Sequence, residues 1–247
     1  MRLLLINPNT TAAMTDKVLE VARTVVSPGT ELVGVTGRFG AAYVATRSSY
    51  AIAAHAALDA WAEADDGGFN AVVLACFGDP GLDGLRELCP LPVIGMADAS
   101  IQLAASMGKR FGIVTGGDRW GPMLREFVAS RGMSDKLASV QTVAPTGGDI
   151  ARDPEAAMTL LADACIAAAK DGADHVILGG AGLAGLVPRI SSRVPVPVID
   201  STIAVTRMAE AVAASRFDKA TAGTFALPLH VPSTGLSPAL AKKISGL

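Results

Sequence analysis

The amino-acid sequence predicts an α/β fold made of two similar three-layer halves, each with a mainly parallel sheet. Short apolar runs rich in Val, Ile and Leu alternate with longer Ala-rich stretches along the 247 residues. The runs are apolar throughout rather than at every second position, which is typical of parallel strands covered by helices on both faces. Segments of the first half also recur in the second half, in the same order. We therefore expect two halves related by a pseudo-two-fold axis.

The expected strands are the apolar runs, at 2–7, 31–37, 71–78, 92–96, 111–116, 175–180 and 197–200. Amphipathic helices are expected in the Ala-rich stretches, several of which end at Gly. These stretches lie at 11–26, 49–65, 100–108, 123–132, 153–172 and 202–215. Strand and helix alternate, as they do in folds with a parallel sheet. Pro, Gly, Thr and Ser become frequent after about residue 217, so we expect 217–247 to form an extended tail that packs back on the first half.

The internal duplication sets the expected domain boundaries. Residues 2–9 (RLLLINPN) can be laid over 110–117 (RFGIVTGG), and 71–76 (AVVLAC) over 175–180 (HVILGG). Each copy of the second segment is followed, at nearly the same distance, by a Pro-Val-Ile strand. We therefore expect an N-terminal half at 1–108 and a C-terminal half at 109–216.

The strand ends indicate where a ligand binds. In parallel α/β sheets, ligands lie at the carboxyl ends of the strands, where the strand order reverses. Asn7, Cys76, Thr115 and Gly180 all fall at such ends. We expect them to converge on one active-site cleft between the two halves.

Composition excludes several kinds of partner. The chain carries 21 Lys and Arg against 23 Asp and Glu, for a net charge of −2, and has no basic cluster for nucleic acid. The apolar run at the N-terminus is too short for a signal or a membrane span, so we expect a soluble protein. The 3 cysteines form no disulfide framework, which indicates a reducing cytoplasm.

The sequence also contains no motif for dinucleotides, nucleoside triphosphates or catalytic zinc. There is no G-x-G-x-x-G at the first strand-to-helix turn, no phosphate-binding loop and no H-E-x-x-H. The 3 histidines are scattered, which argues against a metal site. We expect neither metal nor cofactor.

Cys76 is the main candidate for chemistry. It ends a buried strand and precedes the tight turn Phe-Gly-Asp-Pro-Gly, whose free N–H groups favour a thiolate. We expect its pKa to fall from about 8.5 toward neutrality, which makes it a nucleophile or a proton-transfer group. The alternative is a small buried apolar residue. Cys89 and Cys165 are expected to be structural.

Other residues are expected to hold the ligand. Asn7 and Thr115 would orient it, and Tyr43 would form a wall of the pocket. Backbone N–H groups with little side chain around them can hold a carboxylate or an enolate oxygen. The expected oxyanion-binding positions are Phe77, Gly78, Asp79, Gly179, Gly180, Ala181 and Gly182.

In combination, these motifs resemble the hydantoin racemase branch of the aspartate/glutamate racemase superfamily, to which allantoin racemase also belongs. The motifs that carry the resemblance are INPNT (6–10), ACFGDP (75–80) followed by Arg86-Glu87, PVIG (92–95), Val114-Thr115, LGGAG (178–182) and PVID (197–200). The resemblance implies two α/β halves, a cleft between them and no cofactor. It also implies two cysteines, one on each face of the substrate, that remove and return a proton at a carbon next to a carbonyl. The first corresponds to Cys76.

Gly180 stands where the family pattern has the second cysteine. Racemisation needs a proton acceptor on one face and a donor on the other. One hypothesis is a hydantoin- or allantoin-racemase-like isomerase in which Cys76 works with a water or another polar group. A second is a one-cysteine enzyme like the arylmalonate decarboxylases or maleate isomerases of the superfamily. A third is a non-catalytic binder of small ligands, or an engineered Cys-to-Gly variant. In each case we expect a hydantoin, ureide or small carboxylate as ligand, and a homo-oligomer.

Overall fold

In a computed structural model that describes residues 1–143 and 153–245, the chain forms two sheets of four strands, and all strand pairs in them are parallel. The first sheet has the order β2-β1-β3-β4 and the second the order β6-β5-β7-β8. The first contains β1 (Arg2–Asn7), β2 (Glu31–Thr36), β3 (Ala71–Leu74) and β4 (Val93–Gly95). The second contains β5 (Phe111–Gly116), β6 (Leu137–Val143), β7 (His175–Gly179) and β8 (Val198–Asp200). The identical order confirms the predicted α/β fold of two similar halves.

Two strands differ from the expectation. β6 was missed because its sequence, LASVQTV, interrupts the apolar residues with Ser139, Gln141 and Thr142, as suits a half-exposed strand at the edge of a sheet. β3 is shorter than predicted, because the chain turns after Leu74 and the residues up to 78 form a loop. That loop carries Cys76.

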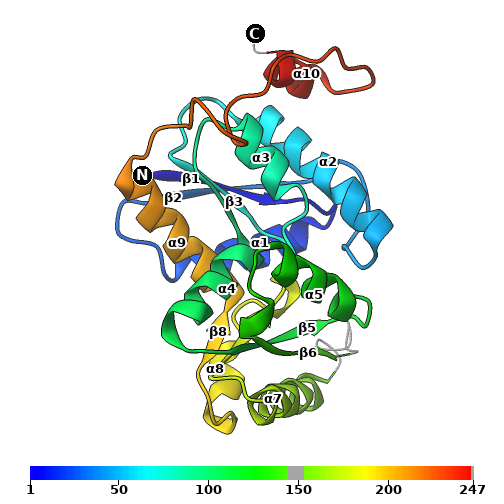
Figure 1. Ribbon diagram of the computed structural model, residues 1–247, viewed down its shortest axis with the longest axis vertical. Coiled ribbons are helices and arrows are strands. Elements are labelled where there is room, and N and C mark those ends of the chain that lie inside the picture. The colour runs from blue at the N-terminus through cyan, green and yellow to red at the C-terminus, as the bar shows by residue number, and fades with distance from the viewer. Residues whose placement is uncertain (144–152, 246–247) are drawn as a thin grey trace.

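Helices connect the strands as expected (Figure 1). Those predicted are α1 (Ala12–Arg23), α2 (Arg47–Ala64), α4 (Met96–Met107), α5 (Trp120–Ser130), α7 (Pro154–Lys170) and α9 (Ser201–Ser215). Those not predicted are α3 (Leu82–Leu88), α8 (Val187–Ile190), α10 (Pro238–Ser245) and the 3-10 turns η1 (Ser134–Lys136), η2 (Ala181–Leu183) and η3 (Ser191–Arg193). Among the described residues, no helix combines the length and the apolar character needed to cross a membrane.

Two helices are exchanged between the halves. α4 follows the last strand of the first sheet but packs against β7 of the second, whereas α9 follows the second sheet and packs against β3 and β4 of the first. The two helices also pack on each other, between the sheets (Figure 1). Both present buried alanines, so their backbones can approach closely. The expected boundary at residue 108 therefore divides the two sheets along the chain, but α4 lies with the second sheet in space.

One apolar core extends through both halves. Leu3 and Leu5 of the first sheet belong to the same buried cluster as Phe111, Ile113 and Ile177 of the second. Burial of apolar surface is the dominant favourable contribution to folding. The two halves are therefore joined by a shared core as well as by the exchanged helices.

The tail crosses the first half and ends in a helix that the sequence analysis did not anticipate. α10 packs on α2, where Leu240 is buried in the apolar cluster of the first half. The Lys243 ammonium lies 2.6 Å from the Asp65 carboxylate. The expectation of an entirely extended tail was wrong, because the segment after Ser237 is a short amphipathic helix with an apolar face to bury.

The close packing of the exchanged helices gives a first prediction. Ala209 of α9 is fully buried in the shared core, so Ala209→Leu should overpack it and lower the free energy of unfolding by about 1–3 kcal/mol. Ala211→Leu, at an exposed position of the same helix, is the matched control and should change it by less than about 0.5 kcal/mol. Urea denaturation of both variants measures the difference. Equal effects of the two substitutions would contradict the assigned packing.

Candidate active site

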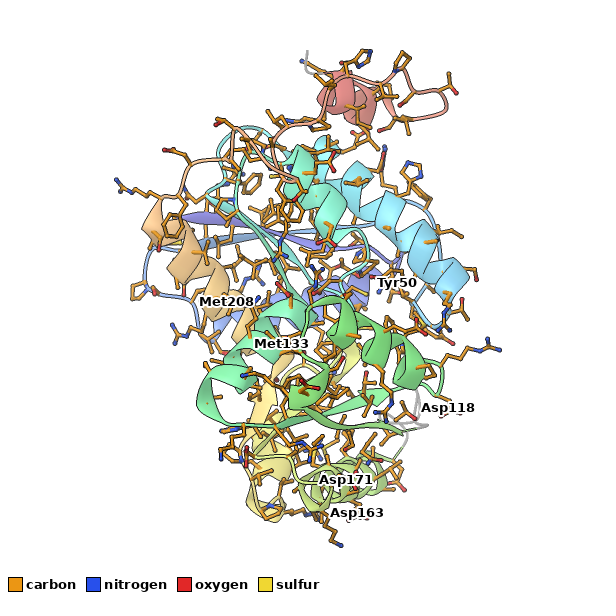
Figure 2. The ribbon with its side chains drawn as sticks, viewed as in Figure 1. Tyr50, Asp118, Met133, Asp163, Asp171 and Met208 are labelled. Atoms are coloured by element: carbon orange, nitrogen blue, oxygen red, sulfur yellow. The ribbon has the colours of Figure 1, made fainter. Side chains whose placement is uncertain are left out.

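Cys76 lies in a tight turn directly after β3. The Asp79 N–H donates to the Cys76 carbonyl at 2.9 Å, and Gly78 and Asp79 both have positive φ angles, of 108° and 55°. The Tyr50 hydroxyl, from α2, donates to the Gly78 carbonyl at 2.8 Å. Tyr50 lies at the level where the two halves meet (Figure 2). These bonds hold the Cys76 turn in one conformation and leave Cys76 8% exposed.

The end of β7 lies directly against this turn. The Phe77 ring fills the space beside Gly179, where an idealised Cβ would lie 2.4 Å from a ring carbon. Thr115, at the end of β5, donates its hydroxyl to the Gly179 carbonyl at 2.7 Å. The structure thus brings together the predicted residues Cys76, Phe77, Gly179 and Thr115, with Gly180 next in the chain.

Gly180 leaves an open position in this arrangement. Among the described residues, and apart from its chain neighbours, the only atom within 4 Å of an idealised Cβ there is Thr115 Oγ1, at 3.7 Å. The φ angle of Gly180 is 134°, a conformation that residues with a side chain rarely adopt. Its N–H donates to the Ser201 hydroxyl at 3.3 Å. The loop is therefore shaped around a glycine, with hydroxyl groups as its polar neighbours.

Aromatic side chains that the sequence analysis did not select cover the Cys76 turn. An idealised Cβ on Gly78 would lie 2.5 Å from the Trp120 ring, and the Trp120 indole N–H donates to the Val44 carbonyl at 3.1 Å. Trp120 and Tyr50 meet edge to face, with ring centroids 6.4 Å apart. One signal was available, because Trp120 is one of 2 tryptophans and lies just after a predicted strand end.

A pocket of about 340 Å³ opens beside this aromatic pair. Its walls come from α2, the Cys76 turn and α5, and its lining residues are Arg47, Tyr50, Gly78, Trp120, Met123, Glu126, Phe127 and Ser130. Arg47 and Glu126, two of the lining residues, form an ion pair whose side chains are largely exposed. The pocket reaches the Cys76 turn at Gly78 and is mostly aromatic and apolar, as small-molecule sites commonly are.

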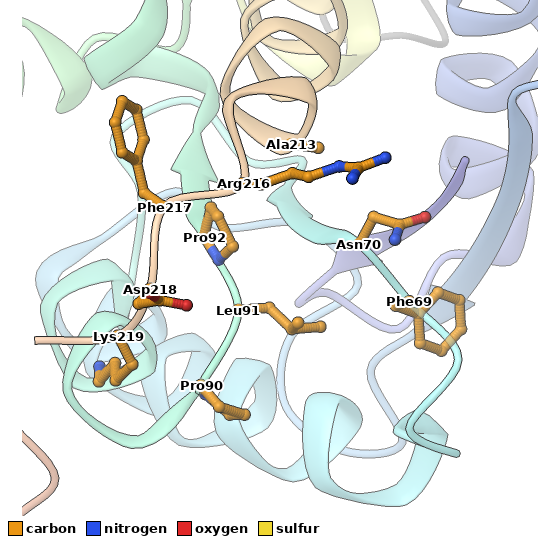
Figure 3. Close-up of a pocket in the computed structure, with 10 residues that line it drawn as sticks. All are labelled: Phe69, Asn70, Pro90, Leu91, Pro92, Ala213, Arg216, Phe217, Asp218 and Lys219. Atoms are coloured by element: carbon orange, nitrogen blue, oxygen red, sulfur yellow. The ribbon is translucent and has the colours of Figure 1, made fainter.

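Another cavity, of about 290 Å³, lies away from Cys76 (Figure 3). It is bounded by the segments that lead into β3 and β4, by the end of α9 and by the start of the tail. Its lining residues are Phe69, Asn70, Pro90, Leu91, Pro92, Ala213, Arg216, Phe217, Asp218 and Lys219. These segments lie at the amino ends of the strands, whereas Cys76 follows a carboxyl end. This cavity is therefore separate from the candidate site.

The Asp79 carboxylate is buried beneath the Cys76 turn. It is 2% exposed and accepts hydrogen bonds from the N–H groups of Ala97, at 3.0 Å, and Asp98, at 2.7 Å, in the first turn of α4. Burial raises the pKa of Asp79 to about 7, although the two N–H groups favour its charged form. The Asp79 N–H is bonded to Cys76, so the expectation that it binds an oxyanion was wrong.

The expectation of a lowered pKa for Cys76 was also wrong. Burial raises the pKa of the Cys76 thiol to about 12, and the negative charge of Asp79 adds to the shift. The turn buries the sulfur and places a carboxylate nearby, and these effects outweigh the N–H groups of the turn. At neutral pH Cys76 is therefore a thiol, which can donate a proton.

Two predicted ligand-binding residues have other surroundings. Asn7 is fully buried, and its amide donates to Asn9 Oδ1 at 2.9 Å and to Thr15 Oγ1 at 3.0 Å. These bonds fix the loop after β1. Tyr43 is 61% exposed, and it is the carbonyl of the neighbouring Val44 that binds Trp120.

The other two cysteines are fully buried, as expected of structural residues. Burial raises the pKa of Cys89 to about 11 and that of Cys165 to about 12. Within residues 1–143 and 153–245, no three His, Cys, Asp or Glu side chains gather as a metal site would require.

Comparisons with known proteins agree with this geometry. The chain matches the family model described as Asp/Glu/Hydantoin racemase over residues 3–209. A hydantoin racemase from Paenarthrobacter aurescens is 34% identical, over 92% of this chain and 98% of its own. The crystal structure of allantoin racemase from Pseudomonas fluorescens superimposes with a TM-score of 0.90 at 35% identity, covering 95% of this chain and 100% of that one. A crystal structure of arylmalonate decarboxylase shares the fold, with a TM-score of 0.60 at 17% identity over 88% of this chain and 94% of that one.

The contact between Phe77 and Gly179 gives a second prediction. Gly179→Ala should displace the Phe77 ring and lower the free energy of unfolding by about 1–3 kcal/mol. Gly182→Ala is the control in the same loop, because its idealised Cβ meets no atom closer than 4.0 Å and its φ is not positive. It should leave stability unchanged within about 0.5 kcal/mol or raise it slightly. Thermal unfolding distinguishes the two, and equal stability of both variants would contradict the contact.

Proposed function

Because the chain belongs to the Asp/Glu/hydantoin racemase family, we propose that it is a cofactor-independent racemase that acts on a hydantoin or a related ureide such as allantoin. The observation that carries the proposal is similarity to hydantoin and allantoin racemases along nearly the whole chain, together with Cys76 in the turn that meets the end of β7. The reaction moves a proton at a carbon next to a carbonyl, which stabilises the resulting carbanion as an enolate.

In this mechanism, Cys76 exchanges a proton with one face of the substrate carbon. The developing enolate oxygen needs fixed N–H donors, each of which contributes about 3–4 kcal/mol in other enzymes. The N–H groups of Phe77, Gly78, Ala181 and Gly182 are the candidates for this role. On the opposite face, Gly180 supplies no side chain, so the second proton transfer uses a water molecule or another polar group. Among the described residues, the Thr115 hydroxyl lies 3.7 Å from an idealised Cβ at that position.

A second candidate function is protonation of an enolate formed by loss of carbon dioxide. Two observations favour it: the Cys76 thiol is protonated at neutral pH, and Gly180 has a conformation that residues with a side chain rarely adopt. Such an enzyme needs only one proton donor. The small-carboxylate substrate would then be an arylmalonate-like diacid, and Cys76 would set the stereochemistry of the product.

Location and assembly belong to the same proposal. A cytoplasmic location is consistent with three free, buried cysteines. A homo-oligomer is supported by apolar side chains exposed along the tail, where Phe217 is 71%, Leu227 60% and Leu229 90% exposed. Exposed apolar groups that cluster on a surface commonly mark protein interfaces.

The direct test is turnover in heavy water. Purified protein is given single enantiomers of 5-substituted hydantoins and of allantoin, and, in parallel, arylmalonates and maleate. Loss of optical rotation with deuterium entry at the α-carbon is expected for a racemase, whereas carbon dioxide release identifies a decarboxylase. Cys76→Ala should lower the rate about 10²–10⁴-fold, because it removes an acid–base group. Cys165→Ala, which changes a buried thiol outside the site, is the control; full activity of Cys76→Ala would refute the assignment.

Restoring a second thiol tests the opposite face. Gly180→Cys and Gly180→Ala should both lose about 1–3 kcal/mol of stability, because each forces a side chain into a positive φ. Only Gly180→Cys adds a proton carrier, so it should racemise the substrate faster than Gly180→Ala. Optical rotation measures the rate and urea denaturation the stability. If the two variants racemise equally, a thiol at this position has no access to the substrate.

A further inference from the structure

The two halves cap corresponding helices with buried carboxylates that come from different places in the chain. In the second half, Asp200 lies directly before α9 and accepts from the N–H groups of Thr202, at 2.8 Å, and Ile203, at 3.3 Å. In the first half, the residue before α4 is Gly95, and the capping carboxylate is that of Asp79. The cap of α4 therefore belongs to the Cys76 turn.

Two local features, the glycine at position 95 and the positive φ of Asp79, accommodate this arrangement. An idealised Cβ on Gly95 would lie 2.3 Å from Asp79 Oδ2, so any side chain at position 95 would displace the carboxylate. Asp79 itself has a φ of 55°, which is uncommon for a residue other than Gly. An acidic residue at position 95 would cap α4 without either constraint. Unlike such a cap, the observed arrangement connects α4 to the turn that carries Cys76.

This connection extends to the part of the site that the second half contributes. α4 packs against β7, which ends at Gly179, and Gly180 follows directly. Within the turn, only two residues separate Asp79 from Cys76, and the Asp79 N–H donates to the Cys76 carbonyl. A shift of Asp79 on α4 would therefore move Cys76 relative to Gly180.

We propose that Asp79 is a positioning residue of the site. Its carboxylate binds the N–H groups at the N-terminus of α4 and thereby fixes the Cys76 turn on that helix. This attachment sets where the thiol lies relative to Gly180. The effect on turnover rests on the proposed function, whereas the effect on the thiol does not. The negative charge of Asp79 is also one of the causes that raise the pKa of Cys76, so the anchor helps to keep the sulfur protonated.

The charged and titratable groups around this pair come from α2, α3 and α4, and from Arg131 just after α5, which lies 3.6 Å from the Asp98 carboxylate and acts to lower the pKa of Tyr50. Asp98 of α4 raises the pKa of Asp79 and Arg86 of α3 lowers it, while Tyr50 of α2 lies close enough for Asp79 and Cys76 to raise its own pKa. Replacing Asp79 by Asn removes one negative charge beside the sulfur. The pKa of Cys76 should then fall, and the thiolate should appear at lower pH.

The test compares Asp79→Asn with Asp200→Asn, which removes the equivalent charge from the other cap. Alkylation of Cys76 by iodoacetamide, followed by peptide mass spectrometry from pH 7 to 11, reports its thiolate. The Asp79→Asn profile should shift to lower pH, whereas the Asp200→Asn profile should match wild type. In the racemase assay, Asp79→Asn should lower kcat up to about 100-fold with little change in KM, because the thiol is misplaced.

A second variant keeps the carboxylate and disturbs only its position. Gly95→Ala adds a methyl group against Asp79 Oδ2 and should lower kcat without removing the charge.

If Asp79→Asn leaves the alkylation profile unchanged, or if both Asp→Asn variants lose kcat in proportion to stability, Asp79 is an ordinary helix cap and the proposal is wrong. If wild type has no racemase activity but the profile shifts only in Asp79→Asn, the role of Asp79 stands and the proposed function fails. Should Asp79→Asn not fold, loss of kcat in folded Gly95→Ala supports the proposal and full activity overturns it.

Discussion

The candidate site depends on the close contact between the ends of β3 and β7. α4 and α9 are also exchanged between the sheets, so each sheet packs against a helix that follows the other sheet. The Phe77 ring lies where a side chain of Gly179 would be, and the Trp120 ring lies where a side chain of Gly78 would be. Each of these rings packs against a glycine of the other half, and together they hold the Cys76 turn against the strand end that leads into Gly180. Without those glycines the strand ends could not approach.

The same contact explains the acid–base character of Cys76. Bringing two strand ends together removes the sulfur from water, and a low dielectric environment disfavours the charged form of a thiol. The negative charge of Asp79, in the same turn, acts in the same direction. Both effects keep the proton on sulfur until a substrate accepts it. The burial that assembles the site therefore also keeps the Cys76 thiol protonated before substrate binds, so that it is an acid and not a nucleophilic thiolate.

The sequence predicts the fold well because strand and helix patterns are local. The continuous apolar runs predict seven of the eight strands in the part of the chain that the structure describes, and they do not predict β6 because Ser139, Gln141 and Thr142 interrupt its apolar residues. The strand ends also led to Cys76, Thr115 and Gly180 as site residues, an assignment that stays a prediction. What failed depends on partners distant in the chain. The pKa of Cys76 depends on tertiary burial and on the Asp79 side chain, and the role of Trp120 depends on a glycine 42 positions earlier, at Gly78. No local pattern encodes such pairings.

Gly180 is more than the loss of a thiol from the family pattern. A cysteine there would be strained, because position 180 has a φ of 134°, and the Gly180 N–H also donates to the Ser201 hydroxyl. The Thr115 hydroxyl, 3.7 Å from the idealised Cβ, donates to the Gly179 carbonyl and so retains oxygen lone pairs with which to accept a hydrogen bond. The loop is thus consistent with a polar, side-chain-free second face. A small polar group on that face would occupy the space that a side chain at position 180 would otherwise fill. The glycine and the nearby hydroxyl therefore form one arrangement. The chemistry of this chain follows from that arrangement, and not from a two-cysteine site that has lost one cysteine.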